Sequence, residues 1–312
     1  MIAARQIDYF TDTDKAVLRA IVYFDIFHYP ITAEEVFEFA PTSINTFSCQ
    51  KSLEKLVAEG LVFQIGNFYS IRNNPALGEA RMKGNTLAKE KMKVAARYSR
   101  IISAFPFVRA VLLSGSISKG FMDERSDIDY FIITEAKRLW IVRTALALFR
   151  RVVLFNSHKN LCTNYFIDTE NLSIPDRNIF TATELCTLRP MYGKTVVQKF
   201  QESNSWALTI LPQGKFDTET PSEKKEFLKK AVEKVFSFSV MDRLNQWLLK
   251  KSMAFWTRKY SHVVNSSDFE VAFRSKAGVS KSHPRFFQKR ALDQFEQKVN
   301  AFEMLHGLDL SR

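Results

Sequence analysis

Two aspartates separated by one residue stand at the start of an apolar run in the middle of the chain. Asp127 and Asp129 precede Tyr130-Phe131-Ile132-Ile133. Because side chains alternate between the two faces of a strand, a strand over 126–133 would place both carboxylates on one face, about 7 Å apart along it. Carboxylates are ligands that Mg²⁺ prefers, commonly one or two of them together with phosphate oxygens. The spacing therefore predicts a divalent-cation site.

A small turn precedes this acidic pair. Ser114, Gly115 and Ser116 follow the apolar run 108–113, which has the length and composition of a buried strand. Glycine lets the backbone approach a ligand closely, and small hydroxyls donate hydrogen bonds. With Lys119 as a nearby cation, the turn is suited to holding phosphate against a cation bound by the two aspartates.

Each motif alone has an ordinary structural explanation. A Gly-Ser dipeptide is common in turns, and a solvated strand start accommodates two aspartates. The combination of both motifs between two apolar strands favours a shared site. Neighbouring carboxylates repel one another, so placing two on one face is costly without a cation or solvent screening.

The order of these motifs resembles the signature of the DNA polymerase beta nucleotidyltransferase superfamily, and especially its small bacterial members. The signature consists here of hydrophobic-Gly-Ser ending at Ser116, a gap over 117–126, and Asp-hydrophobic-Asp-hydrophobic over 127–130. The likeness covers roughly residues 86–200. It implies an α/β (α+β) nucleotidyltransferase fold with a mixed sheet, in which a helix precedes the Gly-Ser strand.

The same resemblance implies an activity, namely transfer of a nucleoside monophosphate from an NTP to an acceptor hydroxyl or phosphate. ATP is the expected donor. Asp127 and Asp129 would hold Mg²⁺ or Mn²⁺, and Gly115, Ser116 and Lys119 would bind the nucleotide. The acceptor (a small molecule, RNA or protein) and the base preference are not given by the sequence.

The resemblance also implies a third carboxylate on the next expected strand, 161–168. Its natural register falls on Asn164, an amide that can coordinate a metal but brings no charge. Asp168 has the same parity four residues on, and Glu184 on the following helix is a candidate for orienting or deprotonating the acceptor. Each of the three also fits a purely structural role. Two carboxylates suffice for one Mg²⁺ completed by triphosphate oxygens, whereas a two-metal mechanism has less support.

The N-terminal part, residues 1–75, is predicted to be a winged helix. A helix from Asp12 or Thr13, a short helix opened by a Thr32–Glu35 capping box, a third helix from Thr42 or Ser43, and a hairpin around Gly66-Asn67 follow in order. Such modules often bind DNA.

The charge of this module argues against DNA binding. Residues 1–75 hold six Lys and Arg against nine Asp and Glu, a net charge of −3, and the third helix offers only Lys51 and Lys55. DNA binding relies on clustered cations that displace counterions. We therefore expect duplex DNA to be an improbable partner and the module to contact protein or serve as a scaffold.

Two further regions complete the expected organisation. Residues 79–211 form the nucleotidyltransferase domain, opened by a long helix over 79–105, with helices expected over 177–190 and 195–211. Residues 220–312 are expected to form a basic helical domain, with 18 Lys and Arg against 10 Asp and Glu. Within it, Lys276, Lys281 and Arg285 surround Gly278 as a possible phosphate-binding cluster. The ordinary alternative is a solvated charged face.

Composition indicates the size of the cores and the cellular compartment that we expect for the protein. Of the 312 residues, 46% are hydrophobic, which is enough for substantial cores, and the net charge is +12. The three scattered cysteines lack metal-ligand spacing and are expected to be reduced thiols in a cytoplasmic protein. The most apolar long run, 139–155, contains three arginines, which excludes it as a membrane span. The first fourteen residues do not have the pattern of a signal peptide.

Two other function classes stay open at this point. A nucleotide-binding regulator that has lost catalysis is compatible with the missing third carboxylate. A partner-binding protein of a toxin–antitoxin-like pair is compatible with the same fold. Metal-dependent NTP turnover separates the first from an enzyme, and a co-purifying protein would indicate the second.

Overall fold

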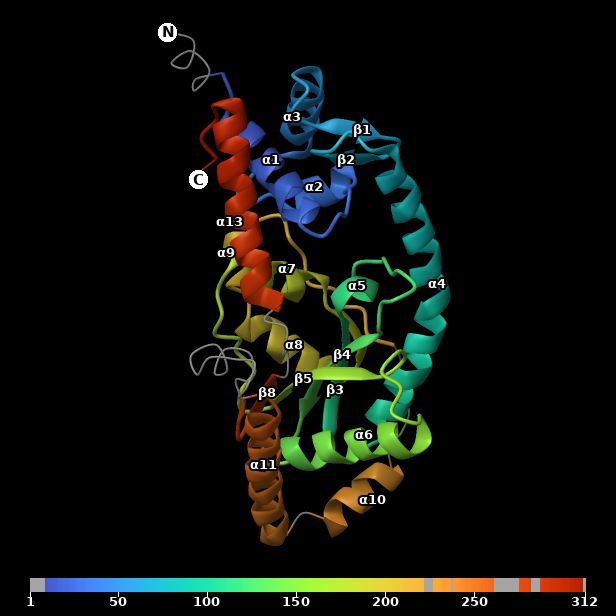
Figure 1. The fold of residues 1–312 in the computed structure, drawn as a ribbon. Helices are drawn as coiled ribbons and strands as arrows, with labels where there is room; N and C mark the ends of the chain where they lie inside the picture. Colours follow the sequence, from blue (N-terminus) through green and yellow to red (C-terminus); the bar gives the residue numbers. More distant parts are fainter. Residues whose placement is uncertain (1–8, 222–226, 237, 261–274, 282–286, 311–312) are drawn as a thin grey trace.

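The protein is organised around one six-stranded mixed sheet (Figure 1). The computed structural model describes residues 9–221, 227–236, 238–260, 275–281 and 287–310. Across the sheet the strands run in the order β6 (Arg189–Tyr192), β3 (Val108–Ser114), β4 (Asp129–Thr134), β5 (Cys162–Asp168), β8 (Val279–Lys281) and β7 (Ser275–Lys276). The chain is thus a mixed α/β protein, as expected.

The register of the central strands determines which side chains meet. β4 runs parallel to β5 and antiparallel to β3, with Ser114 opposite Asp129. On its other side β3 pairs antiparallel with β6, with Leu113 opposite Arg189. The last residue of β3 and the first residue of β4 are therefore neighbours at one end of the sheet.

Helices cover both faces of the sheet, and β4 shows which residues belong to each. Tyr130 and Ile132 pack toward α4 (Pro75–Ser103), α6 (Leu139–Val153) and α11 (Ser239–Tyr260), where Trp140 contacts Trp256. Phe131 packs with the residues of α7 (Ile179–Thr187), α8 (Lys194–Ser203) and α9 (Ala207–Ile210). Because β4 side chains alternate, Asp129 shares a face with Phe131, the α7 side of the sheet.

The N-terminal module contains the expected three helices and hairpin. These are α1 (Asp12–Asp25), α2 (Ala33–Phe39), α3 (Thr46–Ala58), β1 (Phe63–Ile65) and β2 (Phe68–Ser70). The Thr32–Glu35 capping box is confirmed. The expected start of α3 at Thr42 or Ser43 was wrong, because Asn45 caps the helix by accepting a hydrogen bond from the Ser48 N–H at 2.8 Å. Similarly, α1 is capped by Thr11, one residue before the expected position.

Two long helices connect this module to the sheet (Figure 1). The first, α4, begins earlier than the expected Glu79, because Asn74 caps it and Pro75 suits its first turn. Its Arg81 is buried and forms an ion pair with Glu35 of α2 at 2.7 Å. The second, α13 (Phe287–His306), packs on α1, where Phe295 meets Tyr23 edge to face with ring centroids 5.4 Å apart. One core, including Tyr23, Phe295 and Phe131, extends from the module to the sheet.

Two expected helical stretches contain strands instead. The helix expected over 177–190 ends at Thr187, and β6 follows it as an edge strand, a position in which Pro190 is tolerated. The C-terminal region holds α10 (Phe227–Val235), α11 and α13 but also the hairpin β7–β8. β8 pairs with β5, so the region expected to be helical completes the sheet.

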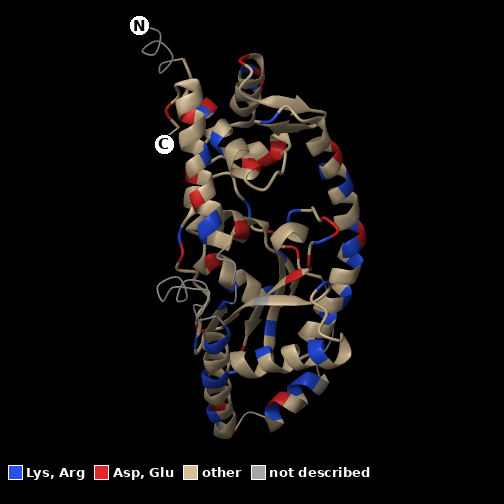
Figure 2. Ribbon diagram, in the orientation of Figure 1, with Lys and Arg blue, Asp and Glu red and all other residues tan. Residues whose placement is uncertain are grey.

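Among the described helices, none combines the length and apolar character needed to cross a bilayer. The arginines of α6, the most apolar candidate, lie within the helix. Lys and Arg recur along α4, α10 and α11 (Figure 2). These helices carry much of the excess positive charge of the chain.

Candidate functional site

The Gly-Ser turn packs directly on the second aspartate. β3 ends at Ser114, and the short helix α5 (Gly115–Ser118) follows without a loop. Gly115 has a φ of +70°, and a Cβ added to it would lie 2.6 Å from Asp129 Oδ2. Only glycine fits both that backbone conformation and that close approach. The structure therefore brings the two sequence motifs together at one end of the sheet.

Asp127 lies in the loop before β4, because the strand begins at Asp129 and not at Ser126 as expected. Ile128 is held from both sides by backbone hydrogen bonds of 3.0 Å, donating to the Lys159 carbonyl and accepting from the Cys162 N–H. Burial is the main cause of the raised pKa of Asp129, and the negative charge of Asp127 raises that pKa further.

Asp129 is held in an environment that disfavours its negative charge. Burial raises its pKa to about 6, and the charges of Asp127 and Glu184 add to the shift. A hydrogen bond from Cys162 and the positive charge of Lys119 act in the opposite direction. A cation bound between the aspartates would relieve this cost, because it favours the ionised carboxylates.

Lys119 lies at the centre of a small polar network. Its Nζ is 2.6 Å from Glu184 Oε1 and donates to the Gly115 carbonyl at 3.2 Å. Its own carbonyl accepts a hydrogen bond from the Tyr29 hydroxyl at 3.0 Å. The lysine expected to bind phosphate is thus close to the turn, and in this structure its ammonium group forms an ion pair with Glu184.

Ser116, the second residue of the turn, contributes its backbone to the loop. Its carbonyl accepts hydrogen bonds from the N–H groups of Lys119 at 3.1 Å and Phe121 at 3.2 Å. These bonds close the turn between α5 and the following loop. They leave the Ser116 hydroxyl without a hydrogen bond to the described residues.

Glu184, the candidate for orienting or deprotonating the acceptor, approaches the pair, since its negative charge adds to the burial that raises the pKa of Asp129. Asp168 pairs with Thr134, five residues further along β4 than Asp129 and hence about 17 Å away. Its Oδ1 instead accepts from the Glu170 N–H at 3.1 Å and from Asn171 Nδ2 at 2.7 Å, so it stabilises the turn after β5.

Asn164 is the extra residue of a register shift in β5. Tyr130 pairs with Thr163 and Phe131 with Tyr165, which leaves Asn164 between the two pairs. The side chain of Asn164 lies outside the described residues. The residue directly opposite Asp129 is Cys162, two positions earlier than the expected register.

Sequence reasoning missed three side chains near the pair. The Cys162 thiol hydrogen-bonds the Asp129 carboxylate. Arg150 Nη1 lies 3.0 Å from His158 Nδ1, and burial with the Arg150 charge lowers the pKa of His158 against the opposing effect of Asp127. The one sequence signal for the contact between Cys162 and Asp129 was that Cys162 begins the strand that follows the acidic pair. The positions of Arg150 and His158 depend on the path of the connection between α6 and β5, which local sequence patterns do not predict.

The expected C-terminal cationic cluster is not gathered on one open loop. Lys276 is exposed on β7, whereas Lys281 on β8 is buried, with its Nζ 2.6 Å from Gln288 Oε1 and 3.5 Å from Asp176 Oδ2. Arg285 lies outside the described residues. Lys281 therefore has a structural role at the junction of the hairpin with its neighbours.

The donor set near the turn is compatible with one nucleotide-bound Mg²⁺. In the described part of the chain, no group of three or more His, Cys, Asp and Glu has the arrangement of a metal site. Asp127 and Asp129 alone match a cation that keeps waters and completes its shell with phosphate oxygens. They do not form a cage that would hold Mg²⁺ by protein ligands alone.

Comparison with known proteins found no relative of this chain. No protein-family model, curated protein or solved structure matches the chain.

Proposed function

We propose that the protein is a metal-dependent nucleotidyltransferase that transfers a nucleoside monophosphate from an NTP, with ATP as the expected donor, to an acceptor hydroxyl or phosphate. The observation that carries the proposal is the contact between the Gly115 turn and Asp129, with Asp127 beside it. A turn of glycine and small hydroxyl residues against two carboxylates supports binding of a nucleotide–Mg²⁺ complex, because the backbone can approach phosphate and the carboxylates can ligate the cation.

In this proposal the aspartates hold the cation and the turn holds the triphosphate. Gly115 and Ser116 donate from backbone and hydroxyl groups, and Lys119 supplies positive charge once it exchanges Glu184 for phosphate. Bound Mg²⁺ would neutralise negative charge that develops on the phosphates. The acceptor oxygen forms a bond to the α-phosphorus, the bond to the bridging oxygen breaks, and pyrophosphate leaves. Glu184, released from Lys119, is the candidate acceptor of the proton.

One observation favours a second candidate function, a nucleotide-binding regulator without catalysis. The strand position beside Asp129 carries the Cys162 thiol, where a further carboxylate would strengthen metal binding. In addition, Glu184 is engaged with Lys119. A protein that binds the nucleotide and changes shape needs the turn and the cation but not a complete catalytic set.

For the N-terminal module we propose a winged-helix fold with a role in contacting protein. Of the two lysines on α3, Lys55 forms an ion pair with the buried Asp14 at 2.9 Å. Only Lys51 then remains on that helix to meet a phosphate, which is too little for useful duplex binding.

The proposal is tested by following label from NTPs that carry it in the α-phosphate. The full-length protein is incubated with each NTP, Mg²⁺ and fractionated cell extract, and the products are separated. Label in a new product together with pyrophosphate release supports transfer. Binding of nucleotide without either would instead support the regulator, and absence of both binding and turnover would contradict both functions.

A further inference from the structure

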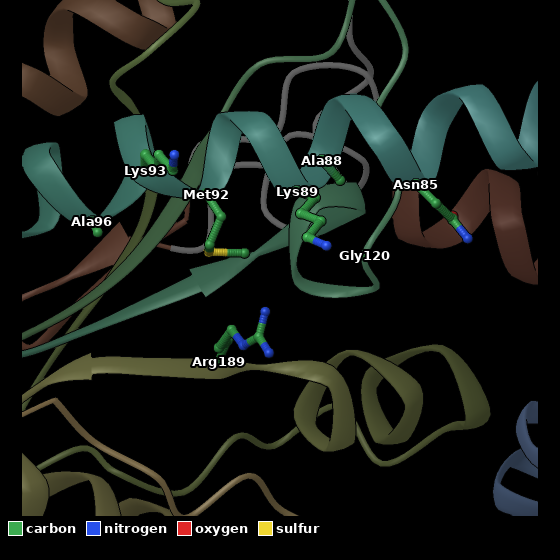
Figure 3. A pocket seen from close by; sticks show the side chains of 8 residues that line it. All are labelled: Asn85, Ala88, Lys89, Met92, Lys93, Ala96, Gly120 and Arg189. Carbon is green, nitrogen blue, oxygen red and sulfur yellow. The ribbon is translucent and has the colours of Figure 1, made fainter.

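A solvent-open cavity of about 440 Å³ lies between α4 and the edge of the sheet (Figure 3). One wall is a single face of α4, and the other is formed by Gly120 and by Arg189 at the start of β6. Figure 3 shows Lys89 and Met92 pointing from the helix toward the strands and Arg189 pointing back toward the helix. The lining residues are Asn85, Ala88, Lys89, Met92, Lys93, Ala96, Gly120 and Arg189.

The charges of this cavity are all of one sign. Lys89, Lys93 and Arg189 line it, and no carboxylate does. Lys89 and Lys93 are one helical turn apart, where like charges repel, and neither has an ion-pair partner among the described residues. Arg189 has a long contact of 3.8 Å to Asp217, with both side chains substantially exposed. Such a pair is weak and can exchange for a better anion.

The remaining lining is suited to an apolar group. Ala88, Met92 and Ala96 form the helix side between the cations, and methionine adapts to ligands of irregular shape. A cavity of this volume is within the range that holds a small-molecule ligand. The lining therefore matches a ligand that combines multiple negative charge with an apolar or aromatic part.

This cavity is separate from the acidic pair. α4 packs on the face of the sheet that carries Leu113 and Tyr130, whereas Asp129 shares the opposite face with Phe131. The loop links the two sites, because Gly120 lines the cavity and the adjacent Lys119 contacts Gly115 and Glu184.

We propose that the cavity between α4 and β6 is a second ligand site, which binds a phosphorylated small molecule of nucleotide size without a metal ion. Lys89, Lys93 and Arg189 neutralise its phosphates, and the apolar face of α4 holds its uncharged part. The site goes beyond the proposed transferase activity. Its ligand would contact the loop that carries Lys119 and so be positioned to influence the acidic pair.

The test uses ADP as the probe, titrated calorimetrically into the full-length protein in EDTA. Chelation removes the divalent cation through which the acidic pair would hold a nucleotide. We expect saturable binding of one ADP, lowered about tenfold or more in Lys89→Ala/Lys93→Ala/Arg189→Ala, because three charge-assisted contacts are lost. Ala96→Trp, which fills the cavity without changing its charge, should weaken binding similarly. Adenosine, which lacks phosphate, should not bind measurably.

Two controls separate this site from its alternatives. Lys83→Ala/Arg97→Ala/Lys199→Ala removes the same charge from exposed positions outside the cavity and should leave ADP binding unchanged. Lys119→Ala should also leave it unchanged, whereas a loss there would assign the ADP to the Gly-Ser turn and overturn the proposal. Equal weakening in both triple variants, or full binding in Ala96→Trp, would reduce the cavity to a charged surface. Absence of ADP binding in the wild-type protein would likewise contradict the proposal.

Discussion

Gly115 and Asp129 are in such close contact that no side chain fits between them. A Cβ at Gly115 would meet Asp129 Oδ2 at 2.6 Å. The turn and the acidic pair are therefore one unit, and a change at either residue must alter the other.

The first prediction concerns that contact. Gly115→Ala should lower Mg²⁺-dependent activity strongly, because the methyl group displaces the carboxylate. Gly120→Ala is the matched control, since Gly120 has nearly the same φ of +69° but nothing within 4 Å of an added Cβ. Both variants should lose about 1 kcal/mol of stability from backbone strain. Thermal denaturation measures the strain that both variants share, and turnover assays measure the effect of the clash with Asp129. Equal activities in the two variants would refute a functional role for the contact between Gly115 and Asp129.

The second prediction follows from the raised pKa of Asp129, about 6 against an ordinary value of 3.8. Between these two pH values Asp129 keeps its proton in the folded protein, whereas the unfolded chain has already released it. The free energy of unfolding should therefore fall as the pH rises from about 4 to about 6 and then level off, with a loss of about 3 kcal/mol from this group. Asp129→Asn should lack this component. Denaturant titrations in EDTA across that range measure it, and parallel profiles for the two proteins would count against the burial argument.

The third prediction concerns Lys119. Lys119→Ala should weaken Mg²⁺–NTP binding about tenfold, because it removes a charge-assisted contact to phosphate. The folded state should persist, as the lysine is only partly buried. Lys199→Ala on the exposed face of α8 serves as the control. Unchanged NTP affinity in Lys119→Ala would leave the lysine as a structural partner of Glu184.

The fourth prediction tests the link between the N-terminal module and the site. The Tyr29 hydroxyl lies 3.0 Å from the Lys119 carbonyl and 3.2 Å from Glu35 Oε1, and the Arg81 guanidinium lies 3.7 Å from the centre of its ring. Tyr29→Phe should cost about 1 kcal/mol of unfolding free energy and weaken NTP binding, since the loop loses an anchor. Tyr9→Phe removes an exposed hydroxyl bonded to Glu59 and should have less effect on both. If the two variants bind NTP alike, the module is not coupled to the loop.

The local features of the site were predictable because each is encoded in consecutive residues. The apolar strand 108–113, the turn at Gly115 and the aspartates lie within one short stretch, and the α4 helix and the N-terminal hairpin also follow local rules of capping and turn formation.

What the sequence did not predict depends on pairing between distant segments. Cys162 lies beside Asp129 because β5 pairs in parallel with β4 and shifts register at Asn164. The hairpin β7–β8 forms from very short strands stabilised by β5. The residue paired with Asp129 is Cys162 and not Asn164 for the same reason, since a shift of a single residue changes which side chains face the site.

The proposed nucleotidyl transfer is tested most directly by the rate of Mg²⁺-dependent pyrophosphate release from ATP, with the acceptor fraction present, in the wild-type protein and in Asp129→Asn. Asparagine keeps the size of the side chain and removes its charge. We expect release by the wild-type protein and a rate about a hundredfold lower in the variant, with the fold retained. Equal rates in the two proteins, or no release by the wild-type protein with any NTP, would contradict the proposed transfer.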